Sequence, residues 1–354
     1  MGDMVYYDWD KTFSYNKKWN FIVSARGYGK TYGLRLQNLK DYRKRKQRFL
    51  AIVRTKSDIA ATADGYFSKI QKNGDFTQYQ FDYSMKSRAL MVKDRRFEDA
   101  QWDVIGYIVA MTEEQFLKTL TFTYGEEVRR VVFDEAIIEK KDRYHRYLPR
   151  EWAILNGIFS TVTRETPANP SQAHWYLFGN AVDLSCPLFE NLGVRKLPSG
   201  YGYHFYGDDK LLHWVEPINQ AGFETETLSG RALAGTAEGD KLFGNAFEQL
   251  DNLMHIEPRP KHAKYWRGYK YNGLVFGLWV EHARGLVHVS RGAPKNQEIF
   301  ALTYDDATIN YALLKTNSQH VRVLGDLFYQ RLLRFDSVQT RELFADMCMS
   351  LGIV

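Results

Sequence analysis

The sequence predicts an α/β fold with a mostly parallel sheet in its first half, followed by a smaller α+β domain. Between about residues 19 and 180, short apolar runs alternate with segments of helical periodicity, which is typical of a parallel sheet covered on both faces. Residues 262–302 contain consecutive strand-like runs separated by turn residues. The Gly-rich, polar stretch between these regions indicates a linker. The expected boundaries are 1–195 for the first domain, 196–235 for the linker and 236–354 for the second domain.

The first domain is expected to contain five buried-type strands and three helices. The strands are Trp19–Ala25, Phe49–Val53, Asp103–Ala110, Arg130–Phe133 and His174–Gly179. The helices are Thr31–Tyr42, Ser57–Ile70 with Ser57 or Asp58 as the N-cap, and Pro149–Val162. Phe76–Lys93 alternates like a hairpin. In the second domain, Asn272–Gly273 and Arg284–Gly285 supply the turns, and residues 306–351 are expected to be helical.

The composition is that of a folded protein in a reducing compartment. The chain has 354 residues, of which 44% are hydrophobic, enough for the cores of two domains. The formal net charge of +6 suits a polyanionic partner but does not establish one. Cys186 and Cys348 are far apart in the sequence, which excludes a disulfide framework and a CxxC metal site. Since no apolar run approaches 18 residues, no membrane span is expected.

A phosphate-binding loop is predicted at Ser24-Ala25-Arg26-Gly27-Tyr28-Gly29-Lys30-Thr31. The usual pattern is GxxxxGK[ST] between a strand and a helix, and both elements are expected here. Gly27 and Gly29 allow backbone N–H groups to converge on an anion, and the helix N-terminus favours its charge. Lys30 would contact the terminal phosphates of ATP, and Thr31 would ligate Mg²⁺. Ser24 departs from the pattern, which has Gly there, and Arg26 is either a cis-acting arginine or a surface residue.

Two carboxylates, Asp134 and Glu135, follow the apolar run Val131–Phe133. The carboxyl ends of parallel strands meet at the edge of the sheet where ligands bind. Asp134 is therefore expected to hold Mg²⁺, and Glu135 to act as the general base on water. Because a phosphoryl transferase does not need an activated water, the second carboxylate favours hydrolysis. The phosphate loop and this pair together predict an ATPase.

Several other polar residues are candidates for roles around the nucleotide. Asn180 follows a strand and is expected to sense the terminal phosphate; the alternative is an ordinary turn residue. Arg164 follows a predicted helix and is expected to act as an arginine finger on a neighbouring subunit. Arg150 competes for this role, and Arg164 paired with Glu165 on the surface is the structural alternative.

Two segments are candidates for nucleic-acid contact. Lys261–Tyr271 interleaves cations with aromatic residues, which suits phosphate contact and base stacking. Its candidates are Lys264, Arg267 and Lys270, and the alternative is a strand with its aromatic residues inward. Arg54 and Lys56 follow the second strand at the ligand-facing edge of the sheet and are expected to face a pore.

The chain resembles the DNA-packaging ATPases of phi29-type tailed bacteriophages. The residues that carry the resemblance run over nearly the whole chain: SARGYGKT, VVFDE, LFGNAV, NGLVFGLWVEHARGL and LRFD at residues 333–336. The missing first Gly and the Arg within the loop are also similar to large terminases. The resemblance implies an ASCE-type, RecA-like ATPase domain, a linker and a C-terminal RNase H-like domain that is a vestigial nuclease. It also implies that Lys118 is a second trans-acting cation beside Arg164.

The resemblance further implies the partners and the location. They are double-stranded DNA, a homo-oligomeric ring (a pentamer) and the portal of an empty prohead, with or without a structural RNA as mediator. The protein is expected in the host cytoplasm and transiently on the portal vertex. Glu281, Asp305 and Asp306 form no clear set for two metal ions, so no nuclease activity is expected. The alternatives are a helicase-type ATPase outside packaging and an ATP-gated assembly module without turnover.

Overall fold

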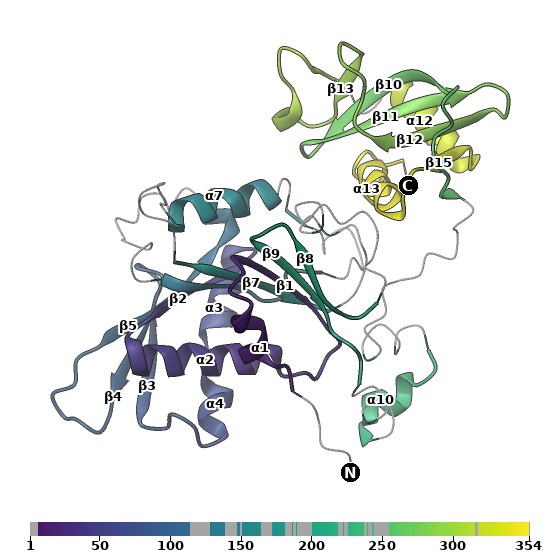
Figure 1. The fold of residues 1–354 in the computed structure, drawn as a ribbon. Coiled ribbons are helices and arrows are strands. Elements are labelled where there is room, and N and C mark those ends of the chain that lie inside the picture. The colour runs from purple at the N-terminus through teal and green to yellow at the C-terminus, as the bar shows by residue number, and fades with distance from the viewer. Residues whose placement is uncertain are drawn as a thin grey trace. The chain divides into compact units, whose positions relative to one another are not determined.

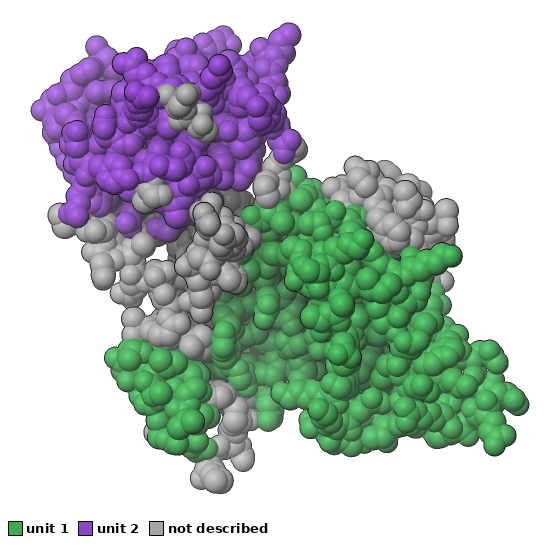
Figure 2. Space-filling view, turned by 180° about the vertical axis from the view of Figure 1, so that it is seen from behind, with its two compact units in different colours: residues 1–182, 198–248 green, residues 183–197, 249–354 purple. Residues whose placement is uncertain are grey.

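The chain forms two compact units, each with its own β-sheet. The structure is a computed structural model that describes residues 6–113, 128–138, 147–148, 151–163, 172–180, 200–218, 226–236, 255–315 and 318–353, and single residues 186, 189, 222, 239 and 243. Unit 1 comprises residues 1–182 and 198–248, and unit 2 comprises residues 183–197 and 249–354 (Figure 2). The chain therefore passes between the units three times, after residues 182, 197 and 248.

Unit 1 is built on a nine-stranded sheet with the order β3-β4-β5-β2-β6-β7-β1-β9-β8 (Figure 1). Its strands are β1 (Trp19–Val23), β2 (Arg48–Val53), β3 (Tyr79–Ser84), β4 (Ala89–Asp94), β5 (Asp103–Ala110), β6 (Val128–Phe133), β7 (His174–Gly179), β8 (Gly202–Tyr206) and β9 (Lys210–Trp214). The run from β5 to β9 is parallel, while β3, β4 and β8 pair antiparallel at the two edges. One strand, β7, lies between β1 and β6, the strands that precede the phosphate loop and the acidic pair. The predicted mostly parallel sheet is confirmed.

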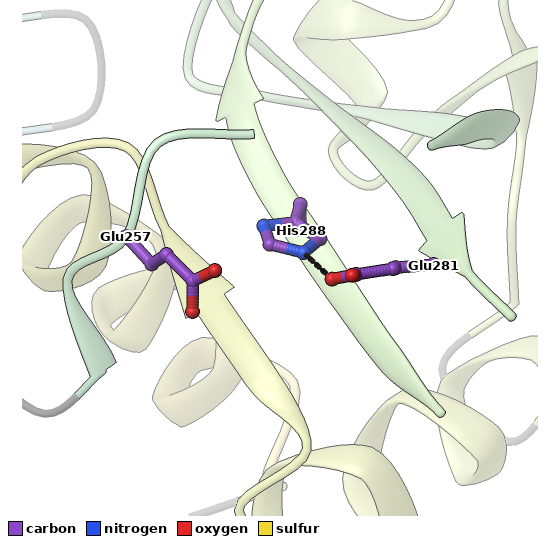
Figure 3. A group of neighbouring side chains, drawn as sticks. All are labelled: Glu257, Glu281 and His288. Carbon is purple, nitrogen blue, oxygen red and sulfur yellow. Dashed lines mark hydrogen bonds and ion pairs between the residues drawn. The ribbon is translucent and has the colours of Figure 1, made fainter. Parts of the chain in front are cut away.

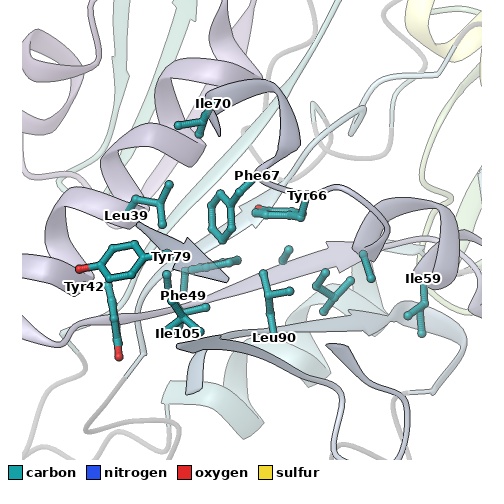
Figure 4. Packing of buried hydrophobic residues seen from close by; sticks show 14 of the residues in the cluster. Leu39, Tyr42, Phe49, Ile59, Tyr66, Phe67, Ile70, Tyr79, Leu90 and Ile105 are labelled. Atoms are coloured by element: carbon teal, nitrogen blue, oxygen red, sulfur yellow. The ribbon is translucent and has the colours of Figure 1, made fainter. Parts of the chain in front are cut away.

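Helices cover both faces of this sheet. The described helices of unit 1 are α1 (Trp9–Ser14), α2 (Lys30–Arg45), α3 (Lys56–Ala63), α4 (Ser68–Lys72), α7 (Glu151–Thr163) and α10 (Leu228–Leu233), with a 3₁₀ turn at Met111–Glu113. In Figure 1, α7 lies on one face and α2 lies on the other. On the α7 face, the Trp19 ring of β1 stacks on Phe159, with centroids 4.8 Å apart. Between α2–α4 and strands β2–β5 lies an apolar cluster that includes Leu39, Phe49 and Phe67 (Figure 4). Burying these large side chains provides much of the stability of unit 1.

The helix expected over residues 57–70 is two helices. Gly65 lies between α3 and α4 with a φ of +67°, a left-handed conformation that breaks the helical path. The helix also begins earlier than expected, because Thr55 is the N-cap of α3. The Asp58 carboxylate accepts the backbone N–H of Thr55 at 2.9 Å and its hydroxyl at 2.8 Å, a capping box with Asp in place of Glu or Gln.

Residues 202–214 are strands of the first sheet, which differs from the linker expected over 196–235. β9 pairs in parallel with the whole of β1, from Trp19–Lys210 to Val23–Trp214, and β8 adds the edge strand. The Val215 N–H continues the ladder to Val23 O at 2.8 Å. The run KLLHW is only five residues long and stands among Gly and polar residues, so its periodicity alone did not identify it as a strand.

Unit 2 is built on a six-stranded sheet with the order β14-β13-β10-β11-β12-β15. The strands are β10 (Lys264–Tyr271), β11 (Leu274–Glu281), β12 (Leu286–Arg291), β13 (Ile299–Ala301), β14 (Ala312–Leu313) and β15 (Leu333–Phe335). β10–β12 form an antiparallel meander, and β13 and β14 extend it in parallel from β10. This is the strand arrangement of RNase H-like folds, as the resemblance implied.

Two helices, α12 (Gln319–Tyr329) and α13 (Val338–Ser350), pack on one face of this sheet, and a 3₁₀ turn spans Tyr304–Asp306. The tail expected to be helical thus also contains two short strands, β14 and β15. Phe276 and Phe344 form the centre of the core, with ring centroids 5.5 Å apart. Both cysteines, Cys186 and Cys348, are buried. No helix of the described chain is long and apolar enough to cross a membrane.

Candidate functional site

The predicted phosphate loop lies between β1, which ends at Val23, and α2, which begins at Lys30. Gly27 and Gly29 have φ values of +86° and +66°, conformations that residues with a Cβ rarely adopt. Gly29 is the N-cap of α2, so the first N–H groups of a 16-residue helix open onto the loop. Free N–H groups and a helix N-terminus at one point favour a bound anion. The expected strand–loop–helix geometry is therefore present.

The Lys30 side chain is folded into the loop. Its Nζ donates to Ser24 O at 3.2 Å, Ser24 Oγ at 2.5 Å and Ala25 O at 3.1 Å, and the residue is 9% exposed. Ser24, at the position where the usual motif has Gly, thus supplies a hydroxyl that holds the lysine. Burial lowers the pKa of Lys30 to about 8, with Asp134 opposing the shift and Arg26 adding to it.

Nucleotide affinity is expected to fall as the pH rises above about 8. Above pH 8 the Lys30 amine is mostly unprotonated in the free protein, but it binds an anionic phosphate best when it is protonated. Nucleotide binding must then be accompanied by proton uptake, which weakens the affinity by about tenfold for each pH unit above the pKa. Titration of a fluorescent ATP analogue from pH 7 to 9.5 measures this. Lys30→Met should bind the analogue more weakly than the wild-type protein at every pH, and its affinity should not fall above about pH 8. A fall in affinity that persists in Lys30→Met would assign the titration to another group.

The lowered pKa of Lys30 also has a consequence for folding. The folded state disfavours the charged lysine, so the free energy of unfolding should rise as pH increases from about 8 toward the ordinary lysine pKa.

Thr31 and Asp134 bring two oxygen ligands together. The Thr31 hydroxyl at the start of α2 donates to Asp134 Oδ2 at 2.8 Å, although 103 residues separate them. Burial raises the pKa of Asp134, and hydrogen bonding to Thr31 and the field of Arg35 oppose this. Hydroxyl and carboxylate oxygens are the ligands that Mg²⁺ prefers, and a cation here would offset the cost of burying the carboxylate. The donor set therefore fits the expected Mg²⁺.

Glu135 has an exposed side chain and a left-handed backbone. Its φ is +55°, uncommon for a residue with a side chain, and its N–H donates to Asp134 Oδ1 at 3.0 Å. Such strain persists only where the surroundings hold it, and it is common at functional sites. The turn directs the two adjacent carboxylates differently: Asp134 toward Thr31, and Glu135 toward solvent.

Arg54, at the end of β2, holds this turn in place. It donates to Glu135 O and Ala136 O, both at 2.7 Å, and to the two carboxylate oxygens of Glu151 at 3.0 and 3.1 Å. The Glu151 side chain is fully buried, and that of Arg54 is 12% exposed. A bidentate pair of this kind has specific geometry, and it connects β2, the turn after β6 and the start of α7. Arg54 is thus a positioning residue for Glu135.

The other residues expected around the nucleotide are only partly described. Asn180 follows β7, whose last residues bond to both sides of the site: Gly179 O accepts from Ser24 N, and Phe178 O accepts from Ala136 N. Arg26 is exposed in the loop. Lys118, Arg150 and Arg164 lie outside the described residues.

The candidates for nucleic-acid contact have different surroundings. Lys56 and Lys264 are exposed. Lys270 lies over the Tyr311 ring, 4.5 Å from its centroid. Arg267 is half-buried and contacts His320 and the Trp266 ring, because a bulge in β10 turns it toward α12. Arg54 and Arg267 are largely taken up by contacts within their own units, so we carry forward only the three lysines. Lys56 also pairs with Glu113 at 3.6 Å, but its side chain remains 66% exposed.

Sequence reasoning missed three residues beside the site: Arg35, Asn38 and Glu151. Arg35 lies four residues after Thr31, and Asn38 lies three residues after Arg35, helical spacings that the sequence shows. The sequence gave less reason to place Glu151 near the site, because an acidic residue in the first turn of a helix is normally explained by the helix dipole.

In unit 2, one group among the described residues has the composition of a metal site: Glu257, Glu281 and His288, whose ligand atoms lie within 4.8 Å of one another (Figure 3). Its carboxylates already have partners. His288 Nε2 is 2.8 Å from Glu281, and Arg284 Nη1 and Nη2 bond to Glu257 at 2.5 and 3.1 Å. These contacts lower the pKa of both carboxyl groups, and they fasten the entry segment of unit 2 to its sheet. The Asp306 carboxylate accepts from the Thr303 hydroxyl and from Gly273 N, while Thr303 is the N-cap of the 3₁₀ turn and accepts from Asp306 N.

Comparisons with known proteins cover nearly the entire chain. The chain is 29% identical over 350 residues to the DNA packaging proteins of Bacillus phages PZA and phi29, covering 97% of each chain. It is 25% identical over 340 residues to the DNA packaging protein of Bacillus phage B103, covering 94% of this chain and 97% of the relative.

Among solved structures, the fold is similar to a chain of the bacteriophage Phi-29 viral genome packaging motor assembly. That match has a TM-score of 0.67 and 23% identity, and it covers 98% of this chain and 100% of the other. A chain of the Phi-28 gp11 DNA packaging motor matches with a TM-score of 0.64 and 16% identity over 98% of both chains. The family model for podovirus DNA encapsidation proteins (Gp16) matches residues 1–351. The chain belongs to the podovirus DNA encapsidation protein (Gp16) family.

Proposed function

We propose that this DNA encapsidation protein hydrolyses ATP at the phosphate loop of unit 1 and uses the energy to move double-stranded viral DNA into a preformed prohead. The observation that carries the proposal is the contact of Thr31 with Asp134, with Glu135 in the next position. It brings a Mg²⁺ ligand set, a phosphate loop and a general base to one edge of the sheet.

The residues of the chain divide the chemistry. The loop N–H groups and Lys30 bind the phosphates, and Ser24 holds Lys30 until they arrive. Bound Mg²⁺, ligated by Thr31 and Asp134, would offset charge on the terminal phosphates. Glu135 orients the attacking water and takes its proton, while Arg54 fixes the backbone of Glu135. Asn180, beyond β7, is proposed to sense the terminal phosphate.

Translocation requires several copies of the chain. We propose a homomeric ring, a pentamer, on the portal vertex of the prohead in the host cytoplasm, in which Lys118 and Arg164 act on the nucleotide of a neighbour. The DNA packaging proteins of phi29 and PZA, to which the chain is 29% identical, support this role. Lys56, Lys264 and Lys270 are proposed to contact DNA phosphates. The Arg284–Glu257 and His288–Glu281 contacts support a structural role for the acidic group of unit 2, so no nuclease activity is proposed.

The test is the ATPase rate of the full-length chain alone, with double-stranded DNA, and with DNA plus proheads. We expect the rate to rise with DNA and to rise most with DNA and proheads together. Strand separation without proheads would support a helicase instead. Nucleotide binding with no turnover under any condition would support the ATP-gated assembly module. No stimulation by either component would contradict the packaging motor but leave the nucleotide site intact.

A further inference from the structure

A cavity of about 430 Å³ lies behind the Thr31–Asp134 contact in unit 1. One wall is the face of α2 that carries Thr31, Arg35 and Asn38. The opposite wall comes from the end of β2, from α3 and from the α3–α4 connection. Its lining includes Thr31, Asp134 and Glu135 but none of Ser24–Lys30, so the cavity opens from the part of the reaction site that holds the proposed Mg²⁺ ligands and general base. The core that supports its far wall contains Tyr66 and Phe67 (Figure 4).

Two donors on α2 face this cavity. Asn38 is 2% exposed, and its Nδ2 has no hydrogen-bond partner, while its Oδ1 accepts from Arg130 Nη1 at 2.8 Å. An unpaired buried N–H group is costly unless a ligand or water in the cavity accepts its bond. Arg35 donates one bond, to Tyr66 O at 2.9 Å, and its guanidinium lies over the Tyr66 ring, 4.1 Å from the centroid. The field of Arg35 already reaches the site, since it lowers the pKa of Asp134 against the effect of burial.

The cavity lining carries two cations, Arg35 and Arg54, and four carboxylates, Asp58, Asp64, Asp134 and Glu135. Past Asp134 and Glu135, Arg35 and the free donor of Asn38 could hold a leaving anion briefly, and the carboxylates of the outer rim would favour its release over its retention. Hydrolysis breaks the bond between the terminal phosphorus and the bridging oxygen. ADP keeps that oxygen with its electron pair, and the water that Glu135 deprotonates becomes part of inorganic phosphate. ADP remains on the loop side, where Lys30 lies. Three exposed residues of the cavity lining form its outer rim: Asp58 and Ala61 in α3, and Asp64 just after the end of that helix.

We propose that this cavity is the exit path of inorganic phosphate, with Arg35 and Asn38 as its transient binding residues, so that phosphate leaves by a different route from ADP. The inference depends on the proposed ATP hydrolysis. It also gives α3 a role. This helix forms one wall of the cavity and would therefore respond to whether phosphate is bound, and Lys56 at its start is a proposed DNA contact.

The discriminating variant is Asn38→Asp. It keeps the oxygen that accepts from Arg130 and is close in shape, but it replaces the free donor with a negative charge. We expect phosphate release to slow by about tenfold or more, since a like charge in a low-dielectric path raises the barrier by at least ~1.4 kcal/mol. Gln47→Glu, the same chemical change just beyond the end of α2 and away from the cavity, is the matched control.

The measurement is a single turnover of ATP by the full-length chain assembled with DNA and proheads. Rapid quenching reports ATP cleavage, and a fluorescent phosphate-binding protein reports free phosphate. In the wild-type protein and Gln47→Glu, release should follow cleavage closely. In Asn38→Asp, cleavage should keep its amplitude and rate while release lags, and the retained amplitude shows that the variant is folded.

Arg35 gives an independent second test. Arg35→Gln should delay release, Arg35→Lys should restore most of it, and Lys40→Gln, which removes an exposed charge from the same helix, should change nothing. Release that tracks cleavage in both Asn38→Asp and Arg35→Gln overturns the exit path but leaves the ATPase. Absence of cleavage in the wild-type protein overturns the proposed function and the exit path together.

Discussion

Replacing Glu135 by glutamine is expected to lower the steady-state rate of ATP turnover by about 10²–10⁴-fold, the usual contribution of a positioned general base. Glutamine keeps the size and hydrogen-bonding reach of the side chain but does not take a proton from water. Glu135, Lys30 and Thr31 are all described residues, and Glu135 forms no hydrogen bond or ion pair with either of the other two, so affinity for ATP and assembly on proheads should be retained.

The matched control is Glu98→Gln, which changes an exposed carboxylate in the connection between β4 and β5. Its turnover should equal that of the wild-type protein. Rate, nucleotide affinity and prohead binding should be measured on the same preparations. Turnover at the wild-type rate in Glu135→Gln would remove this residue from the mechanism and leave the base to another group.

Arg54→Ala is expected to destabilise unit 1 by about 3–5 kcal/mol, because it leaves the Glu151 carboxylate buried without a counter-ion. It also removes both bonds to the carbonyls of residues 135 and 136, so turnover should fall in the fraction that remains folded. Denaturant unfolding of the full-length chain measures the stability, and the ATPase rate measures the positioning.

The double variant Arg54→Ala/Glu151→Gln separates the two effects. Removing the unpaired charge should recover much of the stability, but it does not restore the bonds to the Glu135 backbone, so turnover should stay low. Arg96→Ala is the control, since the Arg96 side chain is 61% exposed and the loss of its ion pair with Asp94 should change little. Equal loss of stability in the single and double variants would contradict the buried-charge explanation.

The fold class and the central site were predictable from the sequence for a physical reason. The strand, loop and helix around Lys30 are contiguous, and the apolar run before Asp134 is buried on both sides, so each gave a local signal. Their meeting followed from a general rule, since the carboxyl ends of parallel strands lie at one edge of a sheet. The family resemblance added the RNase H-like second unit.

The remaining features depend on contacts between distant residues. The partner of Arg54 is Glu151, 97 positions along the chain, and each residue alone has an ordinary explanation as a strand-end cation or a helix-dipole acid. The left-handed backbone of Glu135 is set by its neighbours in space. The capping box at Thr55 was locally readable, but its Asp58 is not the Glu or Gln that usually marks this motif. The strand pair β8–β9 was hidden by its short, aromatic and polar sequence.

The parallel pairing of β9 with β1 determines where this chain can be divided. A fragment that ends near residue 195 would keep the phosphate loop and the acidic pair but would lose the strand that shields one side of β1. The strand before the loop would then become a sheet edge with five consecutive buried residues and unpaired backbone groups, a template for self-association. A soluble ATPase fragment should therefore extend beyond Val215, through the end of unit 1 at residue 248, even though the loop and its catalytic partners all lie in the first half of the chain.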